Sequence, residues 1–201
     1  MWKAIRNLKG NEMELLTEFE IQHLNPVHHG YPAWPGGERW LQLYQTDAST
    51  QVVVTKGLSD GSGQPYEVYL ETDDLISQPT FSSSWQANLI YELGKIIPNV
   101  MDFAERIEKS TFLSVQIQID GAPQDWSLDD ENGNIGLFIG LQKPLQMNLP
   151  EYSLPLNVKL MRPKELLYSI ENGSAGRLEL AERYLEQGIV TVSNSQRKSV
   201  I

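Results

Sequence analysis

The sequence predicts an α+β fold in which paired helices pack against a mixed β-sheet. Segments with the two-residue periodicity of strands occur in blocks of three, and helical segments occur in pairs between those blocks instead of one after each strand. The chain has 201 residues, of which 40% are hydrophobic and 9% aromatic, enough to build one core. We therefore expect a single domain over residues 1–201, with residues 194–201 as a frayed tail.

The hydrophobic pattern places each element in order. A helix starts at Asn11, which forms a capping pair with Glu14. Residues 24–37 contain three prolines and three glycines and should hold no regular element. The remaining elements are strands at 40–46, 51–56 and 66–71, helices at 85–97 and 100–107, strands at 113–119, 135–141 and 156–160, helices at 163–173 and 174–188, and a strand at 189–192.

Local signals refine these assignments. The caps expected for the three helices that begin after small polar residues are Ser83 or Ser84, Asn99 and Ser174. The run Val52-Val53-Val54 is β-branched throughout, which predicts a strand that is covered on both faces. The apolar stripe expected for the last helix consists of Leu178, Ala181, Tyr184 and Leu185.

Charge and cysteine content exclude several classes of function. Aspartate and glutamate number 26 against 16 lysines and arginines, a net charge of −10, which opposes binding to nucleic acid or to anionic membranes and permits a basic partner. Cysteine is absent, so disulfides, thiolate metal sites and cysteine nucleophiles are excluded, and a reducing cytoplasm suits the chain. The sequence contains neither a secretory signal pattern nor an apolar run long enough to span a bilayer, and we expect a cytoplasmic protein.

The segment Gly57-Leu58-Ser59-Asp60-Gly61 matches the G-x-S-x-G pattern that presents the nucleophilic serine of many hydrolases. In those enzymes the pattern joins a strand to a helix, whereas residues 66–71 alternate as a strand does. The three histidines, His23, His28 and His29, all precede Ser59, so the hydrolase order of serine, acid and histidine cannot be built. We interpret the segment as a glycine-rich connection between strands.

The other familiar chemical motifs are incomplete. The histidines lack the spacing of helix-borne metal ligands. Residues 129–134 resemble part of an EF-hand loop, but with Gly133 at loop position six the first and last ligand positions are the apolar Leu128 and Ile139. No dinucleotide fingerprint or G-K-[ST] phosphate loop is present. We expect no metal and no cofactor.

Aromatic side chains framed by polar or acidic residues remain as a candidate binding surface. The alternative for these aromatics is ordinary packing of loops onto the core, and for the acids a solvated turn. The candidate residues are Trp34, Trp40, Asp125, Trp126, Asp129, Asp130 and Glu131.

Residues 54–60 resemble the suppressor of fused family, in which a strand enters Gly-Leu-Ser-Asp and leads into an alternating strand. Gly57, Leu58, Ser59 and Asp60 carry this motif, and a Trp-led helix beginning at Trp85 follows as in the family. The ending also fits, with Leu-Met-Arg-Pro-Lys-Glu-Leu-Leu over 160–167 before a helix and a closing strand. The resemblance covers roughly residues 34–192.

This resemblance implies an α+β fold and no catalytic activity. Animal members of the family bind and restrain a transcription factor by gripping an extended peptide between two domains, and this chain is long enough only for the amino-terminal one. Short bacterial members include immunity proteins encoded beside toxins. We therefore expect a non-enzymatic protein-binding domain, with an immunity protein that neutralises a basic toxin as one form of that role. The alternatives are a serine hydrolase that uses Ser59 and a small-molecule-binding domain that uses the aromatic loop.

Overall fold

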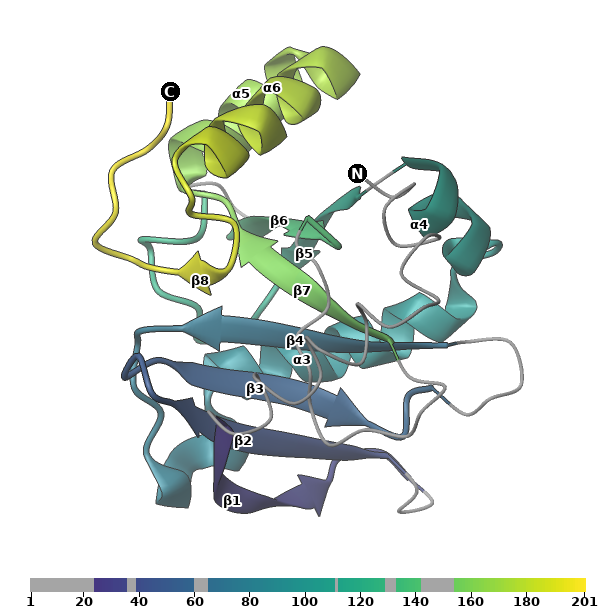
Figure 1. Cartoon of the computed structure of the whole chain (residues 1–201), viewed down its shortest axis with the longest axis vertical. Coiled ribbons are helices and arrows are strands. Elements are labelled where there is room, and N and C mark those ends of the chain that lie inside the picture. The colour runs from purple at the N-terminus through teal and green to yellow at the C-terminus, as the bar shows by residue number, and fades with distance from the viewer. Residues whose placement is uncertain (1–23, 36–38, 60–64, 111, 129–132, 142–153) are drawn as a thin grey trace, which may run out of the picture.

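The computed structural model describes residues 24–35, 39–59, 65–110, 112–128, 133–141 and 154–201. Within these residues, eight strands form one mixed sheet (Figure 1). The strands are β1 (Leu24–Pro32), β2 (Trp40–Thr46), β3 (Gln51–Lys56), β4 (Tyr66–Thr72), β5 (Leu113–Gln118), β6 (Asn134–Ile139), β7 (Leu154–Leu160) and β8 (Val192–Ser193). Their order is β1-β2-β3-β4-β7-β6-β5, and β8 also pairs with β4. Strand β4 is parallel to β7 and β8, and all other pairs are antiparallel.

The helical elements lie between blocks of strands, as the sequence predicts, and the α+β fold class is confirmed. They are the 3₁₀ turns η1 (Gln78–Ser83) and η2 (Ile97–Asn99) and the helices α3 (Trp85–Ile96), α4 (Phe103–Ser110), α5 (Pro163–Glu171) and α6 (Gly173–Glu186). Ser84 caps α3 by accepting a hydrogen bond from the Ala87 amide at 3.2 Å, as expected. Among the described residues, no helix is both long and apolar enough to cross a membrane.

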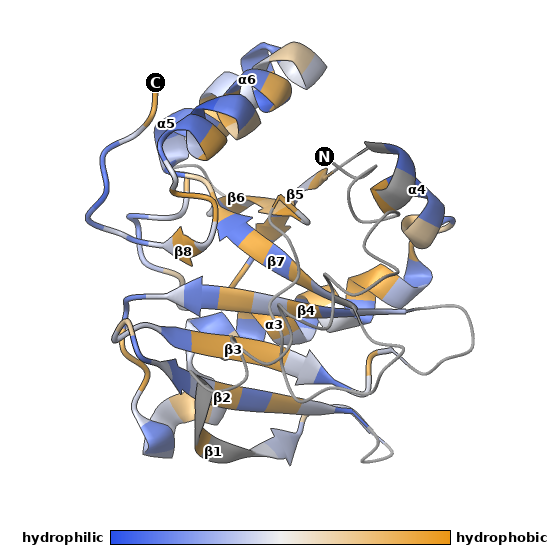
Figure 2. Cartoon of the chain, in the orientation of Figure 1, coloured by the Kyte–Doolittle hydropathy of each residue, from blue (hydrophilic) through white to orange (hydrophobic). Residues whose placement is uncertain are grey.

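Helices pack on the sheet in two places, each on a different part of it. Helix α3 crosses one face of β2, β3 and β4 and closes the larger core there (Figure 1). The helix pair α5–α6 contacts β6 and closes a smaller core that contains Phe138 and Tyr184. Strand β7 therefore alternates, with Leu156, Val158 and Leu160 in the larger core and hydrophilic residues between them (Figure 2).

Glycine at position 136 permits the close approach of α5 to the sheet. A Cβ built on Gly136 would lie 2.6 Å from Cδ1 of Leu166, well inside van der Waals contact. Gly136 separates Ile135 and Leu137, which point into the larger core. The unusual glycine in this apolar strand thus allows one helix of the pair to pack directly on the backbone of β6.

The stretch 24–37 was predicted to be irregular, and this prediction is wrong for its first part. Residues Leu24–Pro32 form β1, paired antiparallel with β2. The strand lies at the edge of the sheet, where a proline needs no second hydrogen-bonding neighbour, and its register shifts twice, between Pro26 and His28 and between His28 and Tyr31. The edge position and the two register shifts thus allow the prolines and the glycine of this segment to lie in a strand.

Three further details differ from the sequence-based expectation. Asn99 does not cap α4, because its side-chain amide donates to the carbonyl of Lys95 at 2.7 Å. Helix α6 begins at Gly173, so Ser174 lies inside it, and Leu178 and Leu185 are exposed. The buried residues of α6 are Gly176, Leu180, Ala181 and Tyr184.

The end of the chain also differs. The strand expected at 189–192 is instead the two-residue β8, Val192–Ser193, which overlaps the expected range at residue 192. The segment 194–201, expected to be frayed, packs against the fold: the Val200 side chain is 8% exposed, and its amide donates to Glu165 at 2.9 Å. The helix expected from Asn11 lies outside the described residues. The all-valine run is confirmed as buried throughout, since Val52, Val53 and Val54 are each 1% exposed or less.

Candidate functional site

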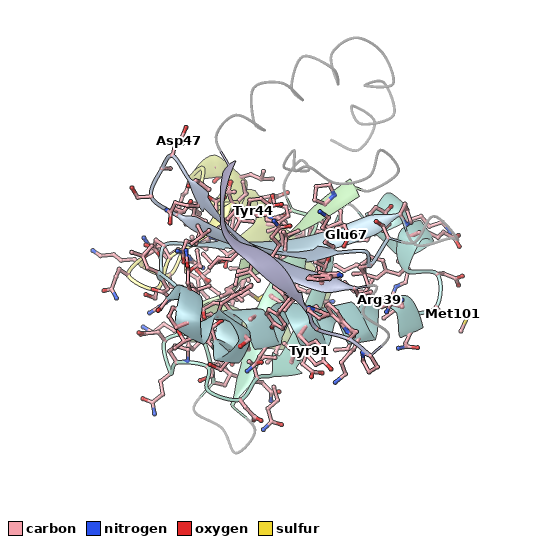
Figure 3. All side chains as sticks on the ribbon, turned by 90° about the horizontal axis from the view of Figure 1, so that it is seen from below. Arg39, Tyr44, Asp47, Glu67, Tyr91 and Met101 are labelled. Carbon is pink, nitrogen blue, oxygen red and sulfur yellow. The ribbon has the colours of Figure 1, made fainter. Side chains whose placement is uncertain are left out.

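The Gly-Leu-Ser turn after β3 holds a buried carboxylate. Glu67 on β4 is fully buried and accepts hydrogen bonds from the amides of Gly57 at 2.9 Å, Leu58 at 3.2 Å and Ser59 at 3.0 Å. Gly57 has a φ of 87°, which favours glycine. Figure 3 shows Glu67 on its strand, with Tyr91 on the α3 side of the sheet.

Two hydroxyl groups complete the shell around this carboxylate. The Ser59 hydroxyl donates to Oε1 of Glu67 at 2.7 Å and the Thr55 hydroxyl donates to Oε2 at 2.6 Å. Ser59 is only 2% exposed. The turn therefore supplies hydrogen-bond donors to a buried carboxyl group, and the Ser59 hydroxyl is itself buried in this arrangement. Asp60, the last residue of the motif, lies outside the described residues.

Two of the three candidate tryptophans are core residues. Trp34 is 9% exposed, and its indole stacks on Tyr91 of α3 at a centroid distance of 5.0 Å. Trp126 is fully buried beneath the Arg162 guanidinium, which lies 5.3 Å from the ring centroid. The side chains of these two tryptophans pack loops onto the core, which was the alternative to a binding surface.

Trp40 is 38% exposed and opens β2. Its register partner is Lys56, at the last residue of β3 and hence near the start of β4. Trp40 and the residues that follow β4 therefore lie at opposite ends of the strands. The acids Asp129, Asp130 and Glu131 lie outside the described residues, so among the candidates only Asp125 and Trp85 remain to be placed.

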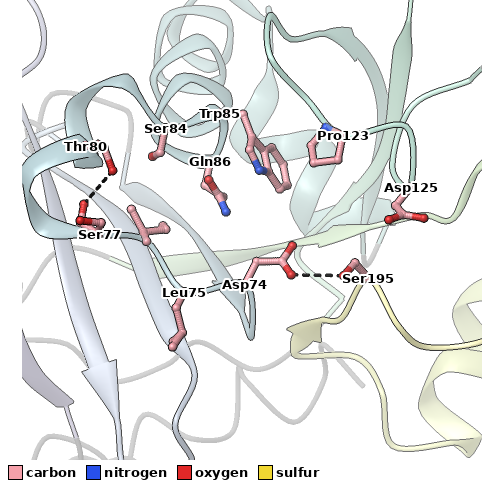
Figure 4. A pocket seen from close by; sticks show the side chains of 11 residues that line it. Asp74, Leu75, Ser77, Thr80, Ser84, Trp85, Gln86, Pro123, Asp125 and Ser195 are labelled. Atoms are coloured by element: carbon pink, nitrogen blue, oxygen red, sulfur yellow. Dashed lines mark hydrogen bonds between the residues drawn. The ribbon is translucent and has the colours of Figure 1, made fainter.

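Asp125 and Trp85 line the same cleft, which has a volume of about 470 Å³ (Figure 4). The cleft lies where β4 ends, between the chain that follows β4, the first turn of α3, the 123–125 loop and residue Ser195. We call it the acidic cleft. It is lined by Asp74, Leu75, Ile76, Ser77, Thr80, Ser84, Trp85, Gln86, Pro123, Asp125 and Ser195.

Local folding positions each wall. The cap made by Ser84 fixes the start of α3 and with it Trp85. The buried indole of Trp126 anchors the 123–126 turn, in which the Trp126 amide donates to the Pro123 carbonyl at 3.0 Å, and the preceding Asp125 side chain is left 57% exposed. Asp74 is fixed by its amide, which donates to the Thr72 hydroxyl at 3.1 Å.

The surface of this cleft combines the carboxyl groups of Asp74 and Asp125 with the indole of Trp85 and the apolar side chain of Leu75. Asp74 accepts a hydrogen bond from the Ser195 hydroxyl at 3.2 Å (Figure 4). Beside it, burial raises the pKa of Asp73, and the neighbouring Asp74 carboxylate raises it further. Leu75 is 71% exposed, an unusual exposure for leucine. Such a cleft can bind a cationic side chain whose stem packs on apolar surface.

A second cleft, of about 570 Å³, adjoins the first at Asp125. We call it the basic cleft because four cationic side chains line it. Arg162 separates the two clefts and is held by the Asp125 carboxylate at 3.4 Å and the Ser195 carbonyl at 2.6 Å. The lining residues are Gln124, Asp125, Arg162, Pro163, Lys164, Arg197, Lys198, Ser199 and Ile201.

A buried ion pair attaches residues 192–200, which we call the C-terminal strap, to the fold. The Arg197 guanidinium donates to both carboxylate oxygens of Glu165 at 2.6 Å, and Tyr184 donates to the same carboxylate at 2.5 Å. Glu165 is fully buried and the Arg197 side chain is 9% exposed. Burial alone would raise the pKa of Glu165, but hydrogen bonds and charge from Arg197 outweigh it and lower this pKa.

Lys159 lies beneath the same strap. It is fully buried on β7, donates to the carbonyl of Val192, and its amine lies 5.7 Å from the centroid of the Tyr184 ring. Burial, and then the positive charge of Arg197, lowers the pKa of Lys159 to about 7. Sequence reasoning missed this residue, because alternation in β7 marks Lys159 only as pointing away from the larger core.

The arrangement defines an α+β domain with a two-part charged cleft at one end of its sheet. Its fold is that of a suppressor of fused homologue from Neisseria gonorrhoeae FA 1090, whose crystal structure is similar with a TM-score of 0.54 over 94% of each chain. The two sequences are 13% identical. No protein-family model and no curated protein matches this sequence. The predicted resemblance to suppressor of fused is thus confirmed at the level of the fold.

Proposed function

We propose that this chain is a non-enzymatic protein-binding domain that holds its partner in the acidic cleft. The observation that supports this most directly is the convergence of Trp85, Leu75 and the carboxylates of Asp74 and Asp125 on one cavity. Exposed apolar and aromatic groups bordered by charge are typical of protein interfaces. The fold it shares with a suppressor of fused homologue agrees with such a role.

The partner that fits is a basic protein, and the role that fits a small acidic domain is that of an immunity protein neutralising a basic toxin in the cytoplasm. Opposite charge accelerates the encounter of two proteins. The net charge of −10 and the Asp74 carboxylate of the cleft favour a cationic partner over a nucleic acid or an anionic membrane, whereas Asp125 is already paired with Arg162.

The test begins with capture of the partner from the native host on the tagged protein, followed by binding kinetics of the pair. Replacing Asp74 and Asp125 with asparagine should slow association several-fold at low ionic strength and change dissociation less. Replacing Glu182 and Glu186, two exposed acids on α6, with glutamine removes the same charge elsewhere and serves as the control. Equal effects of the two double substitutions would overturn the assignment of the cleft.

A further inference from the structure

The two clefts form one continuous feature with opposite charge at its two ends. Asp125 lines both of them, and the C-terminal strap contributes Ser195 to the acidic cleft and Arg197 and Lys198 to the basic one. The boundary between them is the 3.4 Å ion pair of Asp125 with Arg162. A segment lying across this boundary would meet a negative surface first and a positive surface next.

The charges that remain uncompensated can be counted on each side. In the basic cleft, Arg197 is neutralised by Glu165 and Arg162 is paired with Asp125. Lys164 and Lys198 are exposed and have no ion-pair partner within the described part of the chain, so this side carries a positive surplus. In the acidic cleft, the Asp74 carboxylate accepts a hydrogen bond from the neutral Ser195 hydroxyl and forms no ion pair with the residues that the structure describes, so a cationic ligand can still pair with it.

From this distribution we propose that the partner binds through an extended segment of mixed charge, with a basic side chain in the acidic cleft and an acidic side chain in the basic cleft. This inference rests on the proposed function and specifies its ligand. Alternate residues of an extended chain point the same way, so the two charged residues belong at positions two, four or six apart. A uniformly basic segment would satisfy Asp74 but would place a cation against Lys164 and Lys198.

Synthetic peptides test this directly. The probes are fluorescein-labelled nonapeptides of serine and leucine that carry Arg and Glu two, four or six positions apart in both orders, with Arg–Arg and Glu–Glu versions as controls. Fluorescence anisotropy at low ionic strength measures their dissociation constants. We expect one mixed peptide to bind at least about ten-fold more tightly than its Arg–Arg and Glu–Glu counterparts.

Variants of the protein assign each charge to its cleft. Asp74→Asn should remove the preference for Arg over Gln in the peptide, and Lys164→Gln combined with Lys198→Gln should remove the preference for Glu over Gln. Lys95→Gln, on the exposed surface of α3, is the control. Tightest binding of the Arg–Arg peptide, or inorganic phosphate competing as well as the mixed peptide does, would overturn the inference.

Failure of this inference can be told apart from failure of the proposed function. If no peptide binds, but partner association still depends on Asp74 and Asp125, the cleft is an interface and the mixed-charge segment is wrong. If the native partner associates equally well with every variant, the cleft is not the binding surface, and both proposals fail.

Discussion

At the residue scale, Gly94 shows why helix α3 needs a glycine in spite of the low helix propensity of this residue. Glycine costs about 1 kcal/mol relative to alanine inside a helix. A Cβ at Gly94 of α3 would, however, lie 2.4 Å from Cζ2 of Trp34. The buried ring of Trp34 occupies the space that a side chain would need, so this tryptophan attaches the chain after β1 to α3.

The substitution Gly94→Ala should therefore destabilise the protein by about 1–3 kcal/mol, in spite of the better helix propensity of alanine. Urea denaturation measures the free energy of unfolding. In a Trp34→Phe background, which lacks the benzo ring nearest Gly94, the same change should be nearly neutral or stabilising. Destabilisation by the same amount in both backgrounds would show that the contact with Trp34 is not the cause.

Lys159 is a residue whose charge depends strongly on the fold. Its pKa is about 7 in the folded protein, mainly because of burial, against 10.5 for an ordinary lysine. Between these two values the unfolded chain binds a proton that the folded chain has released, so the free energy of unfolding must rise with pH. Below about pH 7 both states are protonated, and this contribution to the pH dependence disappears.

We expect the free energy of unfolding to rise by about 3 kcal/mol between pH 7 and 9.5 in the wild type relative to Lys159→Met. The comparison with Lys159→Met cancels the titration of groups that the two proteins share. Lys164→Met, which removes an exposed lysine, should follow the wild type. Parallel pH curves for the wild type and Lys159→Met would contradict the burial of a readily deprotonated amine.

At the scale of elements, local periodicity predicted most helices and strands because it records which face meets the larger core. Strands β2, β3 and β5 and helix α3 follow their apolar patterns closely. Strand β1 was missed because its prolines are acceptable only at a sheet edge, and edge position depends on the order of strands. That order is not a local property of the sequence.

The C-terminal strap illustrates a second limit. Glu165 and Arg197 are 32 residues apart, and neither is distinguishable in the sequence from a solvated charge. The fold buries Glu165 beside Tyr184 of α6 and brings Arg197 against it. Composition therefore cannot show that this ion pair attaches the C-terminal strap. The same limit applies to the candidate site: Asp125 was predicted and lies in the cleft, whereas Asp74 and Leu75 carried no sequence signal.

At the scale of the whole molecule, the buried polar groups around Glu67 and the charged groups of the two clefts lie at opposite ends of β4. At the start of β4, the Gly57–Ser59 turn satisfies the buried Glu67 and contributes to folding. At the end of β4, Asp74 in the acidic cleft and Lys164 and Lys198 in the basic cleft form no ion pair within the described ranges of the chain. The net charge of −10 therefore describes the molecule less well than the local arrangement, in which a positive cleft adjoins a negative one.

Photocrosslinking in the native host shows whether a protein partner contacts the acidic cleft. The photoreactive residue p-benzoyl-phenylalanine replaces Leu75, which is 71% exposed in the cleft, or Met101, which is 80% exposed near α4 and does not line it. We predict a discrete crosslinked protein from position 75 and none from position 101. The same crosslinked protein from both positions, or one from position 101 alone, would show that the acidic cleft is not the partner's binding surface.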